Sequence, residues 1–161
     1  GYPLDEVMTV ALTHDPLEVY EGSFNYNDRV FVDDVDCFLE RTCERTEYRS
    51  HIENNLPMGI TIEVWYVAQV RWVELDDGPS ILYRTWMSQP AISNLGWIDV
   101  NQQYGVSTTF SSENGTRKLE AGWIDMALGD IELPEDFALN LVVDTIVESG
   151  EKLEAYMDGS Q

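Results

Sequence analysis

The sequence predicts one α+β domain, residues 1–161, in which short amino-terminal helices and consecutive antiparallel strands precede one long carboxy-terminal helix. Apolar and polar residues alternate with a period of two in several stretches between 59 and 128, as in strands with one buried face. Residues 134–157 instead repeat apolar residues at helical spacing. The 161 residues contain no linker, repeat or low-complexity tract, and 43% of them are hydrophobic, which is enough for a single core.

The chain is strongly acidic. It carries 9 basic and 30 acidic residues, for a net charge of −21. Such a surface repels phosphate backbones and anionic lipid headgroups, so nucleic-acid binding is excluded and charge-driven membrane docking is disfavoured. High ionic strength would screen the self-repulsion. We interpret the acidity as a solubilising coat around an apolar interior and not as a ligand site.

Nothing in the sequence indicates a membrane span or a secretion signal. No run reaches about 18 apolar residues, the length that a spanning helix needs. We therefore expect a soluble protein, either cytoplasmic or a mature exported form.

The two cysteines, Cys37 and Cys43, allow two interpretations. In one strand they would lie about 20 Å apart, too far to bond, so a disulfide requires a turn between them. The sequence favours two free buried thiols. It offers neither a CxxC motif nor paired histidines, and so no zinc site.

The amino-terminal part predicts two short helices and an irregular connection. Residues 3–13 place Pro3 and two acids ahead of an apolar run, which favours a helix, although their β-branched residues leave a strand as the alternative. Residues 15–22 form a second helical turn. Residues 23–36 are polar and acidic. Their aspartates, Asp28, Asp33, Asp34 and Asp36, lack the spacing and glycine of an EF-hand, so we expect no metal site.

Strands follow from residue 37. Residues 37–53 predict one or two strands with an exposed face. Residues 59–75 alternate clearly, and the turn at 76–79 makes 80–87 a hairpin partner. The apolar face of the first of these hairpin strands comprises Ile60, Ile62, Val64, Tyr66, Ala68, Val70 and Trp72.

A longer loop at 88–97 leads to two more strands, 97–110 and 116–128, joined by a turn at 112–115. In the first of these strands we expect one apolar face, with Ser107 and Thr109 on the other. The members of that apolar face are Ile98, Val100, Tyr104, Val106 and Phe110. The final helix begins near Pro134, and its apolar stripe comprises Leu139, Val142, Val143, Ile146, Val147, Leu153 and Met157.

The ending of the chain resembles the START-like (SRPBCC) helix-grip superfamily. The strand WIDVNQQYGVSTTF has a central glycine, an Asn-Gly-Thr turn follows, and the strand ending in WIDMALGDIELP opens the long helix. The family places a strand before its first helix, and no residues remain for it here. Either the chain is trimmed, or residues 4–13 form that strand, or the resemblance does not extend to this end.

The resemblance implies a curved antiparallel sheet wrapped around the long helix, with an internal hydrophobic cavity for a lipid, sterol, polyketide or other apolar molecule. The alternative is that the large aromatic side chains simply fill the core. We expect the ligand to contact Tyr66, Ala68, Val70, Trp72, Tyr83, Trp86, Val100, Tyr104, Trp123, Leu139, Val142, Val143 and Ile146.

Two further groups are candidates at the cavity. Ile92, Leu95 and Trp97 would gate its mouth or contact a bilayer, or else pack as an ordinary surface loop. Arg71 and Arg84 would bind a polar group of the ligand, although outward exposure beside a cross-strand acid is the alternative, which parity favours for Arg71.

We therefore hypothesise a monomeric, non-enzymatic carrier or sensor of a hydrophobic small molecule, without cofactor or metal. Its other partners would be a membrane or a cationic protein, met transiently. Two alternatives remain. An enzyme on the same scaffold, such as a polyketide cyclase, aromatase or hydrolase-like member, would need a His, Asp, Glu or Arg with a perturbed pKa in the cavity, and His14, His51, Arg71 and Arg84 are the residues to mutate first. An interaction module would have a filled core. No GxSxG, HExxH, Walker or GxGxxG pattern is present.

Overall fold

The computed structural model describes residues 1–56, 59–129 and 137–159, without the side chains of 56, 137–139, 141 and 142. Its centre is one antiparallel seven-stranded sheet of order β1-β2-β3-β4-β6-β7, in which β5 pairs with β3. The strands are β1 (Phe24–Phe31), β2 (Arg45–Leu56), β3 (Ile60–Leu75), β4 (Gly78–Met87), β5 (Ile92–Ser93), β6 (Asp99–Ser112) and β7 (Gly115–Ala127). The helices are α1 (Leu4–Ala11), α2 (Pro16–Val19), α3 (Val35–Leu39) and α4 (Phe137–Met157).

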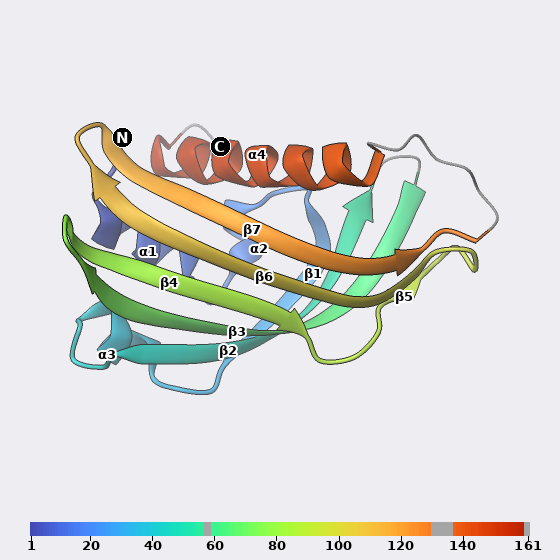
Figure 1. Cartoon of the computed structure of the whole chain (residues 1–161), viewed down its shortest axis with the longest axis horizontal. Coiled ribbons are helices and arrows are strands. Elements are labelled where there is room, and N and C mark those ends of the chain that lie inside the picture. Colours follow the sequence, from blue (N-terminus) through green and yellow to red (C-terminus); the bar gives the residue numbers. More distant parts are fainter. Residues whose placement is uncertain (57–58, 130–136, 160–161) are drawn as a thin grey trace.

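The sheet is strongly curved, and α4 runs along its open side (Figure 1). The short helices α1 and α2 lie on the concave side, near the carboxy-terminal end of α4, which they contact. The predicted α+β architecture, with short helices, consecutive antiparallel strands and a long final helix, is confirmed.

Glycine makes the two tightest hairpins of the sheet possible. Gly78 follows the turn between β3 and β4, and Gly115 follows the turn between β6 and β7. Their φ angles are 115° and 108°, which L side chains rarely adopt. Both turns therefore lie where the sequence predicts them.

One end of the concave face is filled by α1 and α3. Trp72 donates a 2.9 Å hydrogen bond from its indole nitrogen to the Phe38 carbonyl and stacks on the Phe38 ring, with 5.5 Å between centroids. The buried members of this first core cluster are Leu4, Met8, Leu12, Val35, Phe38, Tyr48, Ala68, Val70 and Ile81. Because side chains occupy this end, it offers a ligand no room.

A second core cluster lies at the other end of the sheet. It joins β3, the end of β4, the start of β6 and the loop that contains β5. Its buried members are Ile60, Val64, Met87, Ile98 and Val100. Among the partly buried side chains packed on it are Tyr66, Leu95 and Trp97.

The irregular connection expected at 23–36 is wrong, because this segment forms β1 and α3. The pattern is misleading because β1 turns polar Asn27 and Arg29 toward the concave side. Asp34 caps α3 by accepting hydrogen bonds from the backbone nitrogens of Asp36 and Cys37, at 3.0 and 3.3 Å. The carboxylate of Asp34 therefore stabilises the start of α3.

Cys37 and Cys43 form a disulfide, so the expectation of two free thiols is also wrong. That expectation assumed a strand. Instead α3 and the turn after it bring the two Cα atoms to 5.3 Å, within the range that a bridge requires.

Candidate functional site

A row of small side chains crosses the middle of the concave face. Ala68, Thr85, Gly105 and Gly122 are successive cross-strand partners on β3, β4, β6 and β7. Among the described residues, a Cβ atom placed on Gly122 would have one neighbour within 4 Å, the Tyr104 carbonyl oxygen at 3.8 Å. The surface above this end of the row is therefore open, whereas the row at Ala68 is covered by the first core cluster.

Tyrosine hydroxyls border this row. Tyr66 donates a 2.7 Å hydrogen bond to Oε1 of Gln103. Burial raises the pKa of Tyr66 to about 12, so its hydroxyl stays protonated and can donate at neutral pH. On the other side of the row, the hydroxyls of Tyr48 and Tyr83 hydrogen-bond to each other, and burial raises the pKa of Tyr83 well above its usual value.

Serine hydroxyls add to the polar character of this face. Ser50 is the cross-strand partner of Tyr66, and Ser107 that of Tyr83. Within the described part of the chain, the Oγ atoms of both serines are buried and have no hydrogen-bond partner. The concave face is therefore a mixed surface and not the purely apolar one that the sequence pattern indicates.

The helix that faces this surface keeps apolar side chains uncovered. Val143 is 47% exposed, Ile146 39% and Val147 53%. The same stripe continues to Leu153 and Met157, which are half-buried where α4 contacts α1 and α2. The apolar stripe is thus packed against other helices in the second half of α4. In the first half, its described side chains are exposed.

The sheet also has an exposed apolar side chain on its concave face. Ile124 is the partner of Gln103, lies on the concave face of β7, and is 40% exposed. Figure 1 shows α4 running beside β7 along the open side of the sheet. Apolar surface is therefore exposed on both α4 and β7. Exposing apolar surface to water is unfavourable, so a bound ligand that covered it would stabilise the protein.

Three aromatic residues that the sequence places at the ligand lie on the convex face of the sheet. Trp86, Tyr104 and Trp123 are successive cross-strand partners, in register with Val67, on the convex side. A bulge between Val100 and Gln102 inverts the alternation of β6, so Val100 is buried on the concave side and Tyr104 is not. A ligand between sheet and helix would not touch these three aromatic residues.

The same bulge turns other β6 residues over. Ser107 and Thr109 are buried, although the sequence pattern placed them outward. Val106 and Phe110 share the convex face with Tyr104. A period-two pattern cannot reveal such an inversion, because the bulge adds one residue without changing the alternation on either side of it.

The remaining expected contact residues divide into four groups. Ala68, Val70, Trp72 and Tyr83 lie on the concave face but belong to the first core cluster or pack against it. Tyr66 and Val100 lie at the second cluster, and Val143 and Ile146 are exposed on α4. The side chains of Leu139 and Val142 lie outside the described residues.

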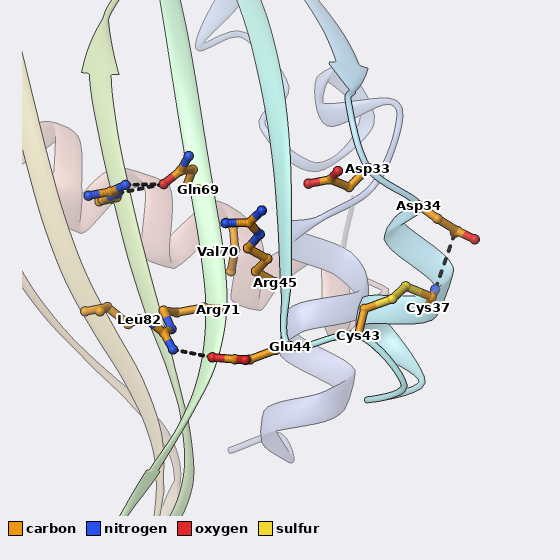
Figure 2. A pocket seen from close by; sticks show the side chains of 11 residues that line it. Asp33, Asp34, Cys37, Cys43, Glu44, Arg45, Gln69, Val70, Arg71 and Leu82 are labelled. Atoms are coloured by element: carbon orange, nitrogen blue, oxygen red, sulfur yellow. Dashed lines mark hydrogen bonds and ion pairs between the residues drawn. A yellow bond between two sulfur atoms is a disulfide. The ribbon is translucent and has the colours of Figure 1, made fainter.

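Arg71 and Arg84 point away from the concave side. Arg71 forms an ion pair with Glu44, and Arg84 donates to Oε1 of Gln69. Both line a convex hollow of about 750 Å³, shown in Figure 2, whose other charged residues are Arg45, Asp33, Asp34 and Glu44. Since three basic and three acidic groups oppose each other, the hollow attracts neither ion sign strongly.

Of the three residues expected at a gate, Ile92 projects most. It is 56% exposed, while Leu95 and Trp97 are partly buried against the second core cluster. Their packing holds the loop in place, and Ile92 is the large apolar side chain that the loop exposes to solvent.

The two histidines lie apart. His14 packs edge-on against the Phe31 ring at 4.8 Å. His51 belongs to a convex-face cluster in which its Nε2 lies 2.6 Å from Oε1 of Glu63 and 2.9 Å from the Tyr26 hydroxyl. Two hydrogen bonds lower the pKa of Glu63: the one from Tyr26 has the larger effect, and the one from His51 the smaller. The pairing of β1 with β2 and of β2 with β3 brings these three side chains together, and sequence reasoning missed it.

Two further observations bear on chemistry. Within residues 1–56, 59–129 and 137–159, His, Cys, Asp and Glu side chains form no group of three that could hold a metal ion. In the same residues, the helices are too short or too polar to span a bilayer.

Comparison with known proteins supports the fold. No protein-family model matches the chain, and no curated protein matches it in sequence. It is similar in structure to the STAR-related lipid transfer protein (fragment 25–204) from Xanthomonas axonopodis, with a TM-score of 0.56 and 14% identity over 98% of this chain and 80% of that one. The chain has a helix-grip fold. At 14% identity the likeness extends to the fold and not to the ligand.

Proposed function

We propose that this protein binds an apolar small molecule, such as a lipid or sterol, between the concave face of the sheet and α4. The observation that carries the proposal is the uncovered apolar surface of Val143 and Ile146 on the helix and of Ile124 on β7. The fold likeness to a lipid transfer protein supports the same class of ligand.

The contacts suggest how such a ligand is held. Covering the apolar side chains contributes about 25 cal/mol per Å² of buried apolar surface, so a molecule of lipid size gains most of its affinity there. The open surface above Gly122 leaves room for its body. The Tyr66 hydroxyl and the Gln103 amide supply hydrogen bonds that orient a polar end.

We propose binding and carriage, not turnover. The groups that border the small-residue row are tyrosine hydroxyls with raised pKa values and an amide, which orient a ligand but are poor acids and bases near neutral pH. Of the candidates for a cyclase, Arg71, Arg84 and His51 lie on the convex face and His14 packs on Phe31.

Native mass spectrometry of the purified protein tests the proposal directly. We expect a retained species heavier than the apoprotein that releases an extractable lipid or sterol. A second measurement titrates the delipidated protein with an environment-sensitive apolar dye and displaces the dye with a fatty acid, a sterol or a phospholipid. If no ligand is retained and no dye binds, the proposal is wrong.

A further inference from the structure

Arg29, on the concave side of β1, is bound to neutral groups. Its Nη1 donates 2.9 Å hydrogen bonds to the carbonyl oxygens of Ala11 and Thr13, at and just after the end of α1, and its guanidinium lies 4.5 Å from the centroid of the Tyr48 ring. Among the described residues, its Nε is buried without a hydrogen-bond partner, and no carboxylate forms an ion pair with it. A buried positive charge is normally balanced by an acidic group, so Arg29 is available to an anion.

Two buried polar side chains adjoin Arg29. Ser50 is its cross-strand partner on β2 and is 4% exposed, and Asn27, the previous concave residue of β1, is 9% exposed. In the described part of the chain, Oγ of Ser50 and Oδ1 of Asn27 have no hydrogen-bond partner. A hydroxyl can donate or accept, and an amide can present either of its ends. A ligand that bonds to these groups would remove the cost of burying them unpaired.

Arg29 and Ser50 lie at one end of a row of concave side chains that crosses the sheet. Ser50 pairs with Tyr66 on β3, and the Tyr66 hydroxyl donates to Gln103 on β6. Gln103 is in turn the partner of Ile124 on β7. The sheet order has five strand spacings of about 4.8 Å between β1 and β7, so the row is about 24 Å long. A long-chain amphiphile laid along it would meet Arg29 at one end and the exposed apolar surface at the other.

The surroundings of Arg29 contain further hydrogen-bond donors. Burial raises the pKa of Tyr20 and that of Tyr83, while the positive charge of Arg29 opposes both shifts, so the two phenols lie near the guanidinium and stay protonated at neutral pH. The Glu120 carboxylate also acts on Tyr20, but it is paired with Lys118 at 2.5 Å. Donors and a positive charge around one point are what an anionic group requires.

We propose that the ligand is an amphiphile with an anionic head group, which Arg29 and Ser50 bind while its chain lies along the row toward Ile124 and α4. A long-chain carboxylate is the simplest such molecule, because a planar carboxylate fits one edge of a guanidinium through two parallel hydrogen bonds. Since Nη1 is used by α1, that edge is the one formed by Nε and Nη2. This inference rests on the proposed function, and it extends the polar end of the site from Tyr66 to Arg29.

Three probes with the same dodecyl chain test the head group. Dodecanoate, dodecyl phosphate and dodecanol each displace an apolar dye from the delipidated protein at neutral pH, where the carboxylate is ionised. We expect at least one of the two anions to bind about tenfold or more tightly than the alcohol, and the tighter anion identifies the head group. If the alcohol binds as tightly as both anions, this inference is wrong and the proposed function stands. If neither the dye nor any probe binds, both are wrong.

Arg29→Gln tests the guanidinium. We expect the affinity for the preferred anion to fall by about tenfold or more and the affinity for dodecanol to stay unchanged. The matched control is Arg49→Gln, which removes the same charge from an exposed position on the convex face of β2 and should change neither affinity. Circular dichroism confirms that each variant is folded. Equal anion affinities in the two variants, or equal losses for anion and alcohol in Arg29→Gln, would contradict the assignment.

Ser50→Ala provides a second test, because Arg29 also holds the end of α1 and its variant can lose stability for that reason. The Ser50 hydroxyl has no partner within the described residues, so its removal should leave the stability in urea unchanged. It should nevertheless weaken binding of the preferred anion several-fold. Ser107→Ala is the matched control, since Ser107 is equally buried and its Oγ is likewise without a described partner, but it pairs with Tyr83 and not with Arg29. Anion affinities that are the same in both serine variants would overturn the proposal.

Discussion

Gly105 and Gly122 are Cα partners across β6 and β7, yet they differ in the space above them. A Cβ atom on Gly105 would approach Oγ1 of Thr85 to 2.8 Å, whereas one on Gly122 would meet one atom of the described part of the chain, at 3.8 Å. A side chain at Gly105 would therefore have to displace the Thr85 hydroxyl, whereas one at Gly122 would displace no described side chain. We infer that the open space at Gly122 belongs to the ligand.

Replacing Gly122 with leucine therefore should block binding with little effect on folding. We expect apolar-dye affinity to fall by about tenfold or more, because the new side chain occupies the space that a ligand body needs. The matched control is Thr108→Leu, which adds a similar side chain to the convex face of β6. If both variants bind the dye like the wild type, the ligand lies elsewhere.

The sequence predicts those elements whose apolar residues recur at regular spacing along the chain. The apolar face of β3 and the stripe of α4 are regular, so their elements are predicted well. The convex placement of Tyr104 and Trp123 could not be predicted, because it depends on one bulged residue of β6. The exposure of Val143 is likewise a property of tertiary packing.

Removing the Tyr66 hydroxyl should distinguish ligand affinity that comes from hydrogen bonding from affinity that comes from apolar contact. In Tyr66→Phe the Gln103 amide loses its 2.7 Å donor. We expect stability to fall by about 1 kcal/mol. We also expect affinity for a ligand with a hydroxyl or carboxyl end to fall several-fold, with no change for a plain hydrocarbon dye. Denaturant unfolding and the two titrations check this, and equal losses for both ligands would contradict it.

Alkaline pH should destabilise the protein through its buried tyrosines. Burial raises the pKa of Tyr66 to about 12 and raises that of Tyr83 well above the ordinary value of 10.0. In the unfolded chain these groups ionise first as pH rises past 10, so the stability that depends on them is complete below pH 10 and is lost toward pH 12. Thermal unfolding between pH 8 and 12 measures the decline. Tyr66→Phe should show a shallower decline, and an unchanged slope would contradict this assignment.

The Cys37–Cys43 disulfide should stabilise the fold without touching the ligand site. It closes a short loop beside α3, for which the chain-entropy model gives about 2 kcal/mol. We expect the Cys37→Ser, Cys43→Ser double variant to lose about that much stability in urea and to keep its dye affinity. The wild type in reductant should match the variant. A variant as stable as the oxidised wild type would show that the loop is held by its other contacts.

Membrane contact, if the protein carries lipids, should depend on Ile92 and not on charge. This side chain is 56% exposed, in a loop held by Leu95 and Trp97, while the net charge of −21 repels anionic bilayers. Ile92→Asp should lower co-sedimentation with neutral phosphatidylcholine vesicles several-fold, because an apolar contact is replaced by a charge. Val30→Asp is the matched control, since Val30 is 59% exposed on β1. Binding that increases with the anionic lipid content, or equal losses in the two variants, would assign membrane contact to a different surface.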